Sequence, residues 1–524
     1  MDLSRYLDTQ EYVTWSKVVP VRWDISLHGW LEPELQDKPL TGLDLRQDKK
    51  LTIVSSLPAT LTKIDISGLP IVDCSPLARL NLLDLNVSGI SSLKASDVPK
   101  SVTCLIARNS GGEDGINFLS HHSQFSNIRE LDVMGTTMED STALSFPKTL
   151  TTLRMNTPGL TTQLLQLPLL TTLECANFQL YTKIPPSVTD LTIDSNAVVD
   201  QLPVNLLHLT CRTTWIDKLS LRCKSLQSLL LTGRGYQGDY TYQDWKIFPH
   251  LTTLAFKDPY RYEDVEFLVD QRDGDAILGL PPTLTKLDIT TSYNCSLNLS
   301  SVPKLQSLKL IGFNEVSNSW TPVYFDNVSG VQLVSLHLGT LGEHNFSPWI
   351  DDSGHDGTKT SLIAIPSLTS FKVDDISPEM PPLDFSIYSS LTELEYHGEI
   401  NAVPQKVQTL FNNAPGRYQL PHTLVNFQGQ KQLKYFAQLY SLLELELDLN
   451  TDWNLLNWPE LLRDLDNLNP RIQKVKILSQ HKKVSSEVEK KLDAWVAKRQ
   501  RYLVELLIVS VHPDSRGELL YLSS

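Results

Sequence analysis

Apolar residues recur through most of the chain in one fixed pattern. The unit is an apolar residue, two variable residues, a second apolar residue that is usually Leu, one variable residue and a third apolar residue. Leu61, Ile64 and Ile66 form a clear copy. Because side chains alternate between the two faces of a strand, this spacing predicts a short strand with its apolar residues inward and its variable residues outward.

The pattern repeats at intervals that average about 23 residues, and self-similarity at such a period is typical of solenoids built from stacked coils. In the third copy, Leu80, Leu83 and Leu85 are the expected inward residues. One coil cannot bury its apolar face alone, so the stacked coils are expected to share one continuous core. The copies begin at Leu40, Leu61, Leu80, Val102, Ile128, Leu150, Leu170, Val188, Leu206, Leu226, Leu251, Leu284, Leu305, Leu333, Leu368, Leu391, Val407, Leu424, Leu442 and Ile472.

An apolar residue followed by proline precedes many copies, starting four residues before the first apolar position. The pairs are Leu57-Pro58, Val98-Pro99, Phe146-Pro147, Ile184-Pro185, Leu202-Pro203, Leu280-Pro281, Val403-Pro404 and Leu420-Pro421. Because proline has no N–H to give to a ladder, it belongs just before the strand, where the coil turns a corner. The shortest coils leave no room for a full helix on the outer side, which is therefore expected to be extended or 3₁₀.

The repeat resembles that of the leucine-rich repeat family, L-x-x-L-x-L-x-x-N-x-L, over about residues 40–448. The units Phe146–Leu150 and Leu280–Leu284 look like the short L-P-x-x-L-x-x-L-x-I repeats of FNIP-type proteins and bacterial secreted effectors. The resemblance implies a curved solenoid with a parallel β-sheet on its concave face and few helices. The chain departs from the family at the Asn position. Among the copies extended to that position, Asn196 alone is an Asn.

Both ends of such a stack need lids, because an open coil exposes its core. The prediction is an N-terminal cap at 1–39, a leucine-rich repeat solenoid at 40–448 and a small α/β C-terminal cap at 449–524. The cap is expected to contain a helix from Asn457 to a stop at Pro470, a second helix that begins with a capping box at Ser486, and a strand from Leu503 to Val511.

The outward positions beside the first apolar residue are rich in threonine. They include Thr62, Thr151, Thr152, Thr171, Thr172, Thr189, Thr252, Thr253, Thr285, Thr369 and Thr392. One interpretation is β-propensity on a solvated parallel sheet. The alternative is a hydroxyl surface that binds a polar ligand.

Composition narrows the class of protein. Leucine accounts for 88 residues although only 41% of the chain is hydrophobic, and no apolar stretch is long enough for a membrane span. The net charge of -14 argues against general nucleic-acid binding. Residues 471–501 are strongly basic, which is explained either by a solvated helix face or by a docking patch for an acidic partner.

The six cysteines are widely spaced and form no C-x-x-C pair. The N-terminus shows no secretory pattern, so reduced thiols and a cytoplasmic or nuclear location are expected. Cys175 and Cys211 fall on inward repeat positions and are expected to be buried and unreactive.

The sequence contains only weak matches to motifs for nucleotide or metal binding. Gly233–Gly238 matches G-x-G-x-x-G, but no helix pattern follows it to hold a phosphate. Asp351–Gly357 hints at a calcium loop but lacks the carboxylate at the twelfth position, where Ile363 stands. We therefore expect no catalytic, cofactor-binding or metal-binding residues.

These observations predict a non-enzymatic scaffold or adaptor that binds a protein partner through the solenoid surface. The alternative is the substrate-recognition subunit of a ubiquitin ligase, an F-box-like leucine-rich repeat protein without a recognisable F-box. Long intervals follow Leu251, Leu305 and Leu333, and extra residues in a solenoid often form loops on the binding side.

These insertions contain aromatic residues that the repeat does not require. Around 258–275 the aromatics lie among acidic residues, which suits a basic protein segment, although the rings could instead pin the loops to their own coils. The residues predicted to bind the partner are Tyr240, Tyr242, Trp245, Tyr260, Tyr262 and Trp349.

Overall fold

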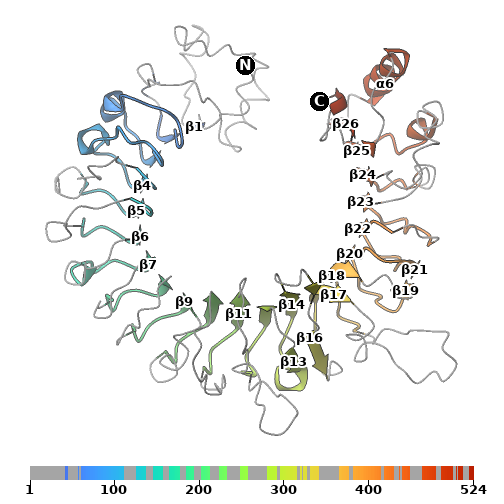
Figure 1. The fold of residues 1–524 in the computed structure, drawn as a ribbon, viewed down its shortest axis with the longest axis horizontal. Helices are drawn as coiled ribbons and strands as arrows, with labels where there is room; N and C mark the ends of the chain where they lie inside the picture. Colours follow the sequence, from blue (N-terminus) through green and yellow to red (C-terminus); the bar gives the residue numbers. More distant parts are fainter. Residues whose placement is uncertain are drawn as a thin grey trace. The chain divides into compact units, whose positions relative to one another are not determined.

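The chain forms successive coils, each of which contributes a strand to a parallel ladder (Figure 1). It divides into two compact units, unit 1 at Met1–Tyr236 and unit 2 at Gln237–Ser524. The computed structural model describes residues 42–44, 57, 59, 61–110, 125–136, 146–156, 164–176, 184–193, 202–212, 223–232, 248–257, 280–291, 295–314, 319–320, 323–326, 331–341, 365–376, 382–414, 418–429, 436, 439–448, 463–479, 486–499, 503, 505–510 and 519–523.

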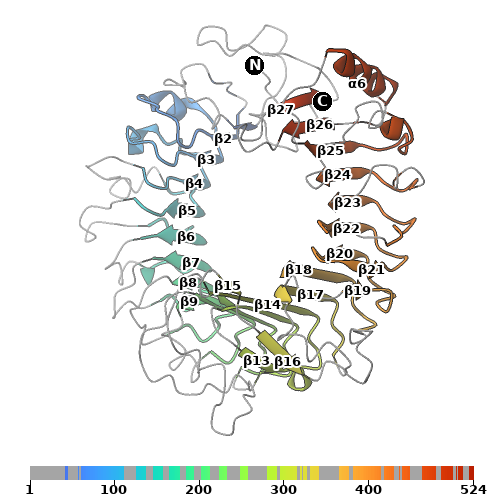
Figure 2. The same ribbon diagram turned by 45° about the vertical axis from the view of Figure 1, so that its right-hand side comes forward.

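In unit 1, each strand pairs in parallel with the strand of the next coil along the chain (Figure 2). This arrangement confirms the predicted repeat of short parallel strands. The strands are β1 (Gly42–Asp44), β2 (Lys63–Asp65), β3 (Asp84–Asn86), β4 (Cys104–Ile106), β5 (Glu130–Val133), β6 (Thr152–Met155), β7 (Thr172–Cys175), β8 (Asp190–Ile193), β9 (His208–Arg212) and β10 (Ser228–Thr232).

Unit 2 has a second parallel ladder of the same kind. Its strands are β11 (Thr253–Lys257), β12 (Lys286–Thr291), β14 (Ser307–Asn314), β17 (Ser335–Leu341), β18 (Ser370–Ile376), β20 (Glu393–Glu395), β22 (Thr409–Asn412), β23 (Asn426–Gly429), β24 (Glu444–Asp448), β25 (Lys474–Ser479) and β26 (Glu505–Ser510).

Smaller elements accompany this second ladder. β13 (Cys295–Asn298) pairs in parallel with β16 (Val323–Asp326), and β19 (Leu383–Asp384) pairs in parallel with β21 (Ile400–Ala402). β15 (Ser319–Trp320) is antiparallel to β14, and β27 (Leu519–Ser523) is antiparallel to β26. The repeat pattern did not predict these elements.

The register of the ladders follows the predicted copies. The second apolar residue of one copy lies opposite that of the next, so Leu131 pairs with Leu153 and Leu153 pairs with Leu173. The two degenerate copies obey the same rule, because Leu410 lies opposite Phe427. Keeping this register stacks the inward side chains of successive coils on one another.

The third copy is an exception, and its predicted frame is wrong by two residues. Leu85, predicted as its third apolar residue, lies opposite Ile64 and is therefore the second. Leu82 and Val87 are buried, whereas Leu83 is 46% exposed. The error arises because closely spaced leucines fit two frames of the same pattern, and only the structural register with Ile64 separates them.

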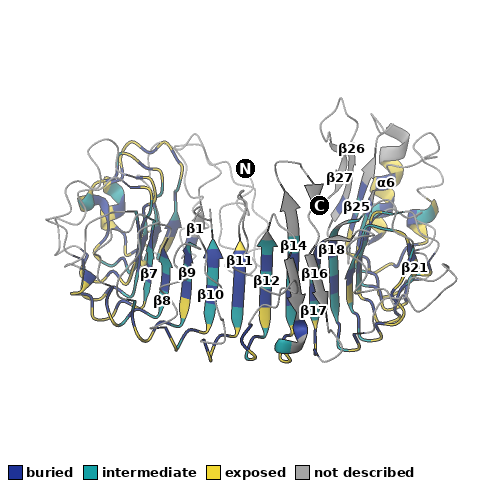
Figure 3. Cartoon of the chain, turned by 60° about the horizontal axis from the view of Figure 1, so that its bottom comes forward, coloured by how far each residue is buried: buried dark blue, intermediate teal, exposed yellow. Residues whose placement is uncertain are grey.

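The core lies between the strands and the outer side of each coil. Leu153 and Leu287 are fully buried and Leu191 is 2% exposed, which confirms their predicted inward positions. In β6, buried and half-buried residues alternate, and Figure 3 shows the same alternation along other strands. The sheet therefore buries one face and presents the other.

The corner before each strand is a tight turn in which proline has the predicted place. Pro147 O accepts a hydrogen bond from Leu150 N at 3.1 Å, and Pro281 O accepts one from Leu284 N at 3.1 Å. The same bond joins Pro99, Pro185, Pro203, Pro404 and Pro421 to Val102, Val188, Leu206, Val407 and Leu424. Pro58 lies outside the described residues.

The outer side of the described coils contains 3₁₀ segments and the short strands β19 and β21 (Figure 1), which agrees with the prediction of an extended or 3₁₀ outer side. The 3₁₀ segments are η2 (Ser75–Arg79), η3 (Ala95–Asp97) and η10 (Leu299–Ser301). A short proline-containing turn at η2 buries Leu77 without the length that an α-helix would need.

Hydroxyl groups link neighbouring coils at the corner. Ser225 Oγ donates to Leu206 O at 2.9 Å, and Thr283 Oγ1 donates to Leu251 O at 2.7 Å. Equivalent bonds run from Ser101, Thr149, Ser367 and Thr423 to the carbonyls of Leu82, Ile128, Leu333 and Val407. Each bond satisfies a carbonyl that the ladder leaves open, so the repeating polar group of these coils is a Ser or Thr hydroxyl.

Threonines one position after the first apolar residue form a second series of bonds. Thr151 Oγ1 donates to Arg129 O at 3.0 Å, and Thr285 Oγ1 donates to Thr252 O at 3.0 Å. The same bond is made by Thr171, Thr189, Thr369 and Thr392. Because these hydroxyls bond the preceding coil, the finding favours the structural interpretation over a hydroxyl surface for a ligand.

The C-terminal residues contain the predicted helix α6 (Ser486–Arg499), which begins at Ser486 as predicted; the capping box itself stays a prediction. Its Leu492 and Trp495 are buried, and the Arg499 guanidinium lies 4.3 Å from the centroid of the Trp495 ring. Arg499 Nη2 also donates to Asp466 O at 3.2 Å, which ties α6 to the helical turn at 463–466.

The ladder extends beyond residue 448. β25 pairs with β24, β26 pairs with β25, and the antiparallel β27 follows β26. The copy that begins at Ile472 is thus a coil of the ladder, and the expected strand from Leu503 corresponds to β26. The N-terminal segment 1–39 lies outside the described residues, so the division into two caps and a solenoid stays a prediction. None of the described helices is long and apolar enough to cross a bilayer.

Candidate interaction surface

The aromatic residues predicted to bind a partner are outside the described residues. This holds for Tyr240, Tyr242, Trp245, Tyr260, Tyr262 and Trp349. Their role stays a prediction. The Gly233–Gly238 and Asp351–Gly357 segments lie outside the described residues as well.

The outward face of the strands is the broadest surface that the described residues form. We call the outward side chains of β2–β9 the unit 1 strand face. The unit 2 strand face consists of the outward side chains of the ladder strands β11, β12, β14, β17, β18, β20, β22, β23, β24 and β25. In β6 and β7 these side chains are half-buried, whereas their neighbours toward the core are buried. Parallel sheets are usually covered on both sides. The exposure of these side chains shows that no described segment covers this face in β6 and β7.

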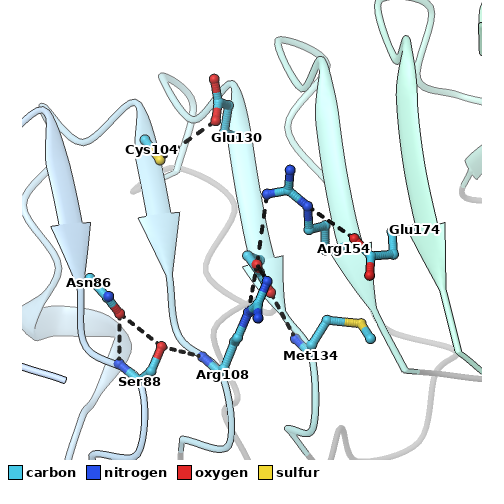
Figure 4. A network of polar contacts seen from close by, with 9 residues as sticks. Asn86, Ser88, Cys104, Arg108, Glu130, Met134, Arg154 and Glu174 are labelled. Carbon is cyan, nitrogen blue, oxygen red and sulfur yellow. Dashed lines mark hydrogen bonds and ion pairs between the residues drawn. The ribbon is translucent and has the colours of Figure 1, made fainter. Parts of the chain in front are cut away.

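A polar network crosses the unit 1 strand face from one coil to the next. Asn86 Nδ2 donates to Asp65 Oδ2 at 2.8 Å, and Ser88 Oγ donates to Asn86 Oδ1 at 2.8 Å. Arg108 N then donates to Ser88 Oγ at 3.1 Å. Figure 4 shows the part of the network around Asn86, Ser88 and Arg108. The first and third of these bonds join neighbouring coils, and the second joins Asn86 and Ser88 within one coil.

Asp132 is the centre of this network. It is 3% exposed, and its Oδ2 accepts hydrogen bonds from Arg108 Nε at 2.8 Å and Nη2 at 2.6 Å. Its Oδ1 accepts a bond from Met134 N at 3.3 Å. The hydrogen bonds and the charge of Asp132 raise the pKa of Arg108 above its ordinary value, so the guanidinium stays charged.

The network continues through Arg154. Its Nη1 lies 3.8 Å from Asp132 Oδ2, and its Nε lies 3.2 Å from Glu174 Oε2 (Figure 4). Charges therefore alternate in sign along neighbouring strands. The sequence carried this signal, because Asp132, Arg154 and Glu174 occupy the same position of successive copies. Sequence reasoning missed it because the outward positions were compared for threonine and not for charge.

The unit 2 strand face carries a second ionic cluster. His337 Nε2 lies 2.9 Å from Asp374 Oδ2, and Lys372 Nζ lies 3.4 Å from Asp374 Oδ1 and 2.9 Å from Glu395 Oε1. His397 Nε2 lies 3.7 Å from Glu395 Oε1. The cluster spans β17, β18 and β20, so it fixes side chains of three neighbouring strands.

Asp374 remains ionised within this cluster. Burial by itself would raise the pKa of Asp374, but the hydrogen bond with His337 and the positive charges of His337 and Lys372 outweigh it, and they hold the pKa below its ordinary value.

Cysteine thiols do not provide a nucleophile on the described surface. Cys175 and Cys211 are buried, which confirms the prediction for both residues. Burial raises the pKa of Cys175 to about 12 and also raises the pKa of Cys211. Cys104 is half-buried beside Glu130, and burial together with that carboxylate raises its pKa to about 11. These thiols hold little thiolate near neutral pH.

The described residues contain no group of three or more His, Cys, Asp or Glu side chains that could hold a metal ion. The expectation that the chain uses no metal or cofactor stays a prediction.

No protein-family model matches the chain, and no curated protein matches it in sequence.

Proposed function

We propose that the chain is a non-enzymatic scaffold or adaptor that binds a protein partner on its strand faces. The observation that carries the proposal is the wide parallel sheet with alternate side chains exposed and charged groups fixed in lateral networks. Side chains that are already held in place lose little conformational entropy when a partner binds, so such a surface favours association. A long stack of coils also supplies a surface suited to an extended partner.

We further propose that the coils are leucine-rich repeats of the short L-P-x-x-L type. The proline turns and the register of the second apolar residues support this assignment. Ser and Thr hydroxyls at the corner take the structural role that the family gives to Asn. In this proposal residues 1–39 cap the first coil, and residues 449–524 form an α/β cap in which β27 and α6 end the stack.

The raised pKa values of Cys104 and Cys175 support a role other than thiol catalysis. The overall negative charge supports a partner other than nucleic acid in general. The proposal places the chain in the cytoplasm or nucleus, where the five described cysteines would remain reduced, as they are in the structure.

Affinity capture with quantitative mass spectrometry tests the proposal. The bait is the full chain, compared with Thr152→Arg on the unit 1 strand face and Gln428→Arg on the unit 2 strand face. Val204→Arg is the matched control, because Val204 is an exposed turn residue that lies off the strands. The proposal predicts a protein partner that the control retains and at least one strand-face variant loses at unchanged thermal stability.

Equal recovery by all variants would contradict a strand-face site. Recovery of ubiquitin-ligase adaptor subunits as the stable partners would instead favour the alternative that the chain is the recognition subunit of such a ligase. A turnover activity that a point change in a surface site abolishes would contradict the non-enzymatic assignment.

A further inference from the structure

Strands β22 and β23 form a neutral gap in the charged face of unit 2. Their outward side chains are Thr409 and Phe411 in β22, and Asn426 and Gln428 in β23, and all four are half-buried. Thr409 lies opposite Asn426, and Phe411 lies opposite Gln428. Neither strand contains a charged residue.

Glutamates border this gap on both sides. β20 presents Glu393 and Glu395 beside β22, and β24 presents Glu444 and Glu446 beside β23. Neighbouring strands lie about 4.8 Å apart, so the two pairs of carboxylates are separated by three steps, or about 14 Å. The register therefore gives a neutral strip with two acidic edges at a defined separation.

The cations that balance these glutamates lie outside the gap. Lys372 Nζ of β18 contacts Glu395 Oε1 at 2.9 Å, and His397 Nε2 lies 3.7 Å from the same oxygen. From β25, Lys476 Nζ contacts Glu446 Oε1 at 2.7 Å and Lys474 Nζ lies 3.7 Å from Glu444 Oε1. Glu393 is exposed and has no ion-pair partner among the described residues. Within the described part of the chain, Glu393 is therefore the unpaired carboxylate of the four, and the lysines paired with the other three belong to β18 and β25, on the sides away from the gap.

Phe411 gives the gap an aromatic surface. The inward positions of β22 are filled by Leu410 and Asn412, so the Phe411 ring lies on the face opposite the core. A partly exposed aromatic ring beside carboxylates attracts the side chain of Arg or Lys through cation–π and ionic interactions together. This chemistry is absent from the polar networks of the unit 1 strand face.

We propose that Phe411 and the glutamates of β20 and β24 bind an extended protein segment that carries two basic side chains four residues apart. The inference rests on the proposed scaffold function and specifies its partner. An extended chain advances about 3.4 Å per residue, so four residues span about 14 Å. Residues separated by an even number also point to the same side of an extended chain. One basic side chain reaches Glu393 and the ring of Phe411, which is its diagonal neighbour on β22, and the other reaches the edge formed by Glu444 and Glu446.

Labelled synthetic peptides test this inference directly with the full chain. One peptide carries two Arg residues at i and i+4 in a Gly/Ser background. A second carries them at i and i+2, and a third carries Glu at i and i+4. Fluorescence anisotropy at low ionic strength gives the three affinities. We expect the i, i+4 Arg peptide to bind most tightly and the Glu peptide to show no binding.

The chain variants are Glu393→Gln/Phe411→Ala and the control Glu399→Gln. Glu399 is exposed and precedes the outer strand β21, so its change removes one charge from the same coil away from the gap. The double variant is expected to bind the i, i+4 Arg peptide about tenfold more weakly, while the control binds within about twofold of the unaltered chain. Both variants are compared with the unaltered chain in thermal unfolding.

Equal affinity of the double variant and the control would overturn the inference, as would equal binding of the two Arg peptides or any comparable binding of the Glu peptide. If both variants unfold early, Phe411→Leu, which keeps the apolar volume but removes the ring, replaces the double variant. A negative peptide result together with a partner that depends on Thr152 would overturn this inference alone and leave the proposed function in place.

Discussion

Arg108 donates two hydrogen bonds to one oxygen of Asp132, whose side chain is almost completely buried although it belongs to the outward row of β5. Removing this carboxylate leaves Arg108 and Met134 N without their acceptor. We therefore expect Asp132→Ala to destabilise unit 1 by about 2–3 kcal/mol in denaturant unfolding. Glu130→Ala, in the same strand but exposed, is expected to change stability by less than about 0.5 kcal/mol. Equal effects would contradict the central place of Asp132 in the network.

The corrected frame of the third copy is tested by two substitutions in neighbouring positions. Leu85→Asp places an unpaired charge in the core and is expected to cost several kcal/mol, about the same as Leu153→Asp. Leu83→Asp alters an exposed side chain and is expected to change stability by less than about 1 kcal/mol. Thermal unfolding measures both changes. A larger loss of stability from Leu83→Asp than from Leu85→Asp would support the original frame, in which Leu83 points inward.

The hydroxyl bonds at the corner are expected to contribute to stability individually. Thr283→Val keeps the shape of the side chain but removes the donor to Leu251 O, and we expect a loss of about 1 kcal/mol. Thr253→Val is the control, because Thr253 is half-buried on β11 and makes no hydrogen bond with its side chain among the described residues. Equal stability of the two variants would show that the hydrogen bond from Thr283 to Leu251 O contributes nothing to the free energy of unfolding.

The cluster around Asp374 predicts a pH dependence. The pKa of Asp374 is lowered in the folded chain from its ordinary value of 3.8, so folding is favoured by the ionised carboxylate above that value. This contribution is lost as the pH falls below 3.8 and through the folded pKa. The stability difference between the unaltered chain and Asp374→Asn is therefore expected to be largest near neutral pH and to shrink toward pH 2.

Denaturant unfolding at a series of pH values measures that difference, with Glu399→Gln as the control for loss of one exposed carboxylate. A difference that stays constant from neutral pH to about pH 2 would show that the pairs with His337 and Lys372 do not stabilise the ionised form of Asp374.

The sequence predicted the coil because its two determinants are local. Alternation around residues such as Leu153 specifies which side of a strand faces the core, and proline three residues before Leu150 specifies the corner. The sequence pattern from Ser486 to Glu489 likewise predicted the first turn of α6. The frame of the third copy could not be settled in this way, because only pairing with a neighbouring coil distinguishes Leu83 from Leu85.

The candidate surface was harder to predict because it depends on register between residues far apart in the chain. Asp132 and Arg154 become neighbours only when their coils stack, and the intervals between coils vary. The neutral gap at Phe411 arises in the same way, from the strands that adjoin β22. Aligning the outward positions of successive copies, as well as the apolar ones, would have indicated both features before the structure.

Site-specific photocrosslinking tests the central claim that the strand faces bind the partner. A benzophenone side chain is introduced at Thr152 on the unit 1 strand face or at Thr409 on the unit 2 strand face, and at Val204 or Asp384 as exposed controls off these faces. After irradiation in cell extract, the account predicts a crosslinked protein from at least one strand-face position and a much lower yield of it from both controls. Crosslinking of that protein from Val204 or Asp384, with none from Thr152 and Thr409, would contradict the account.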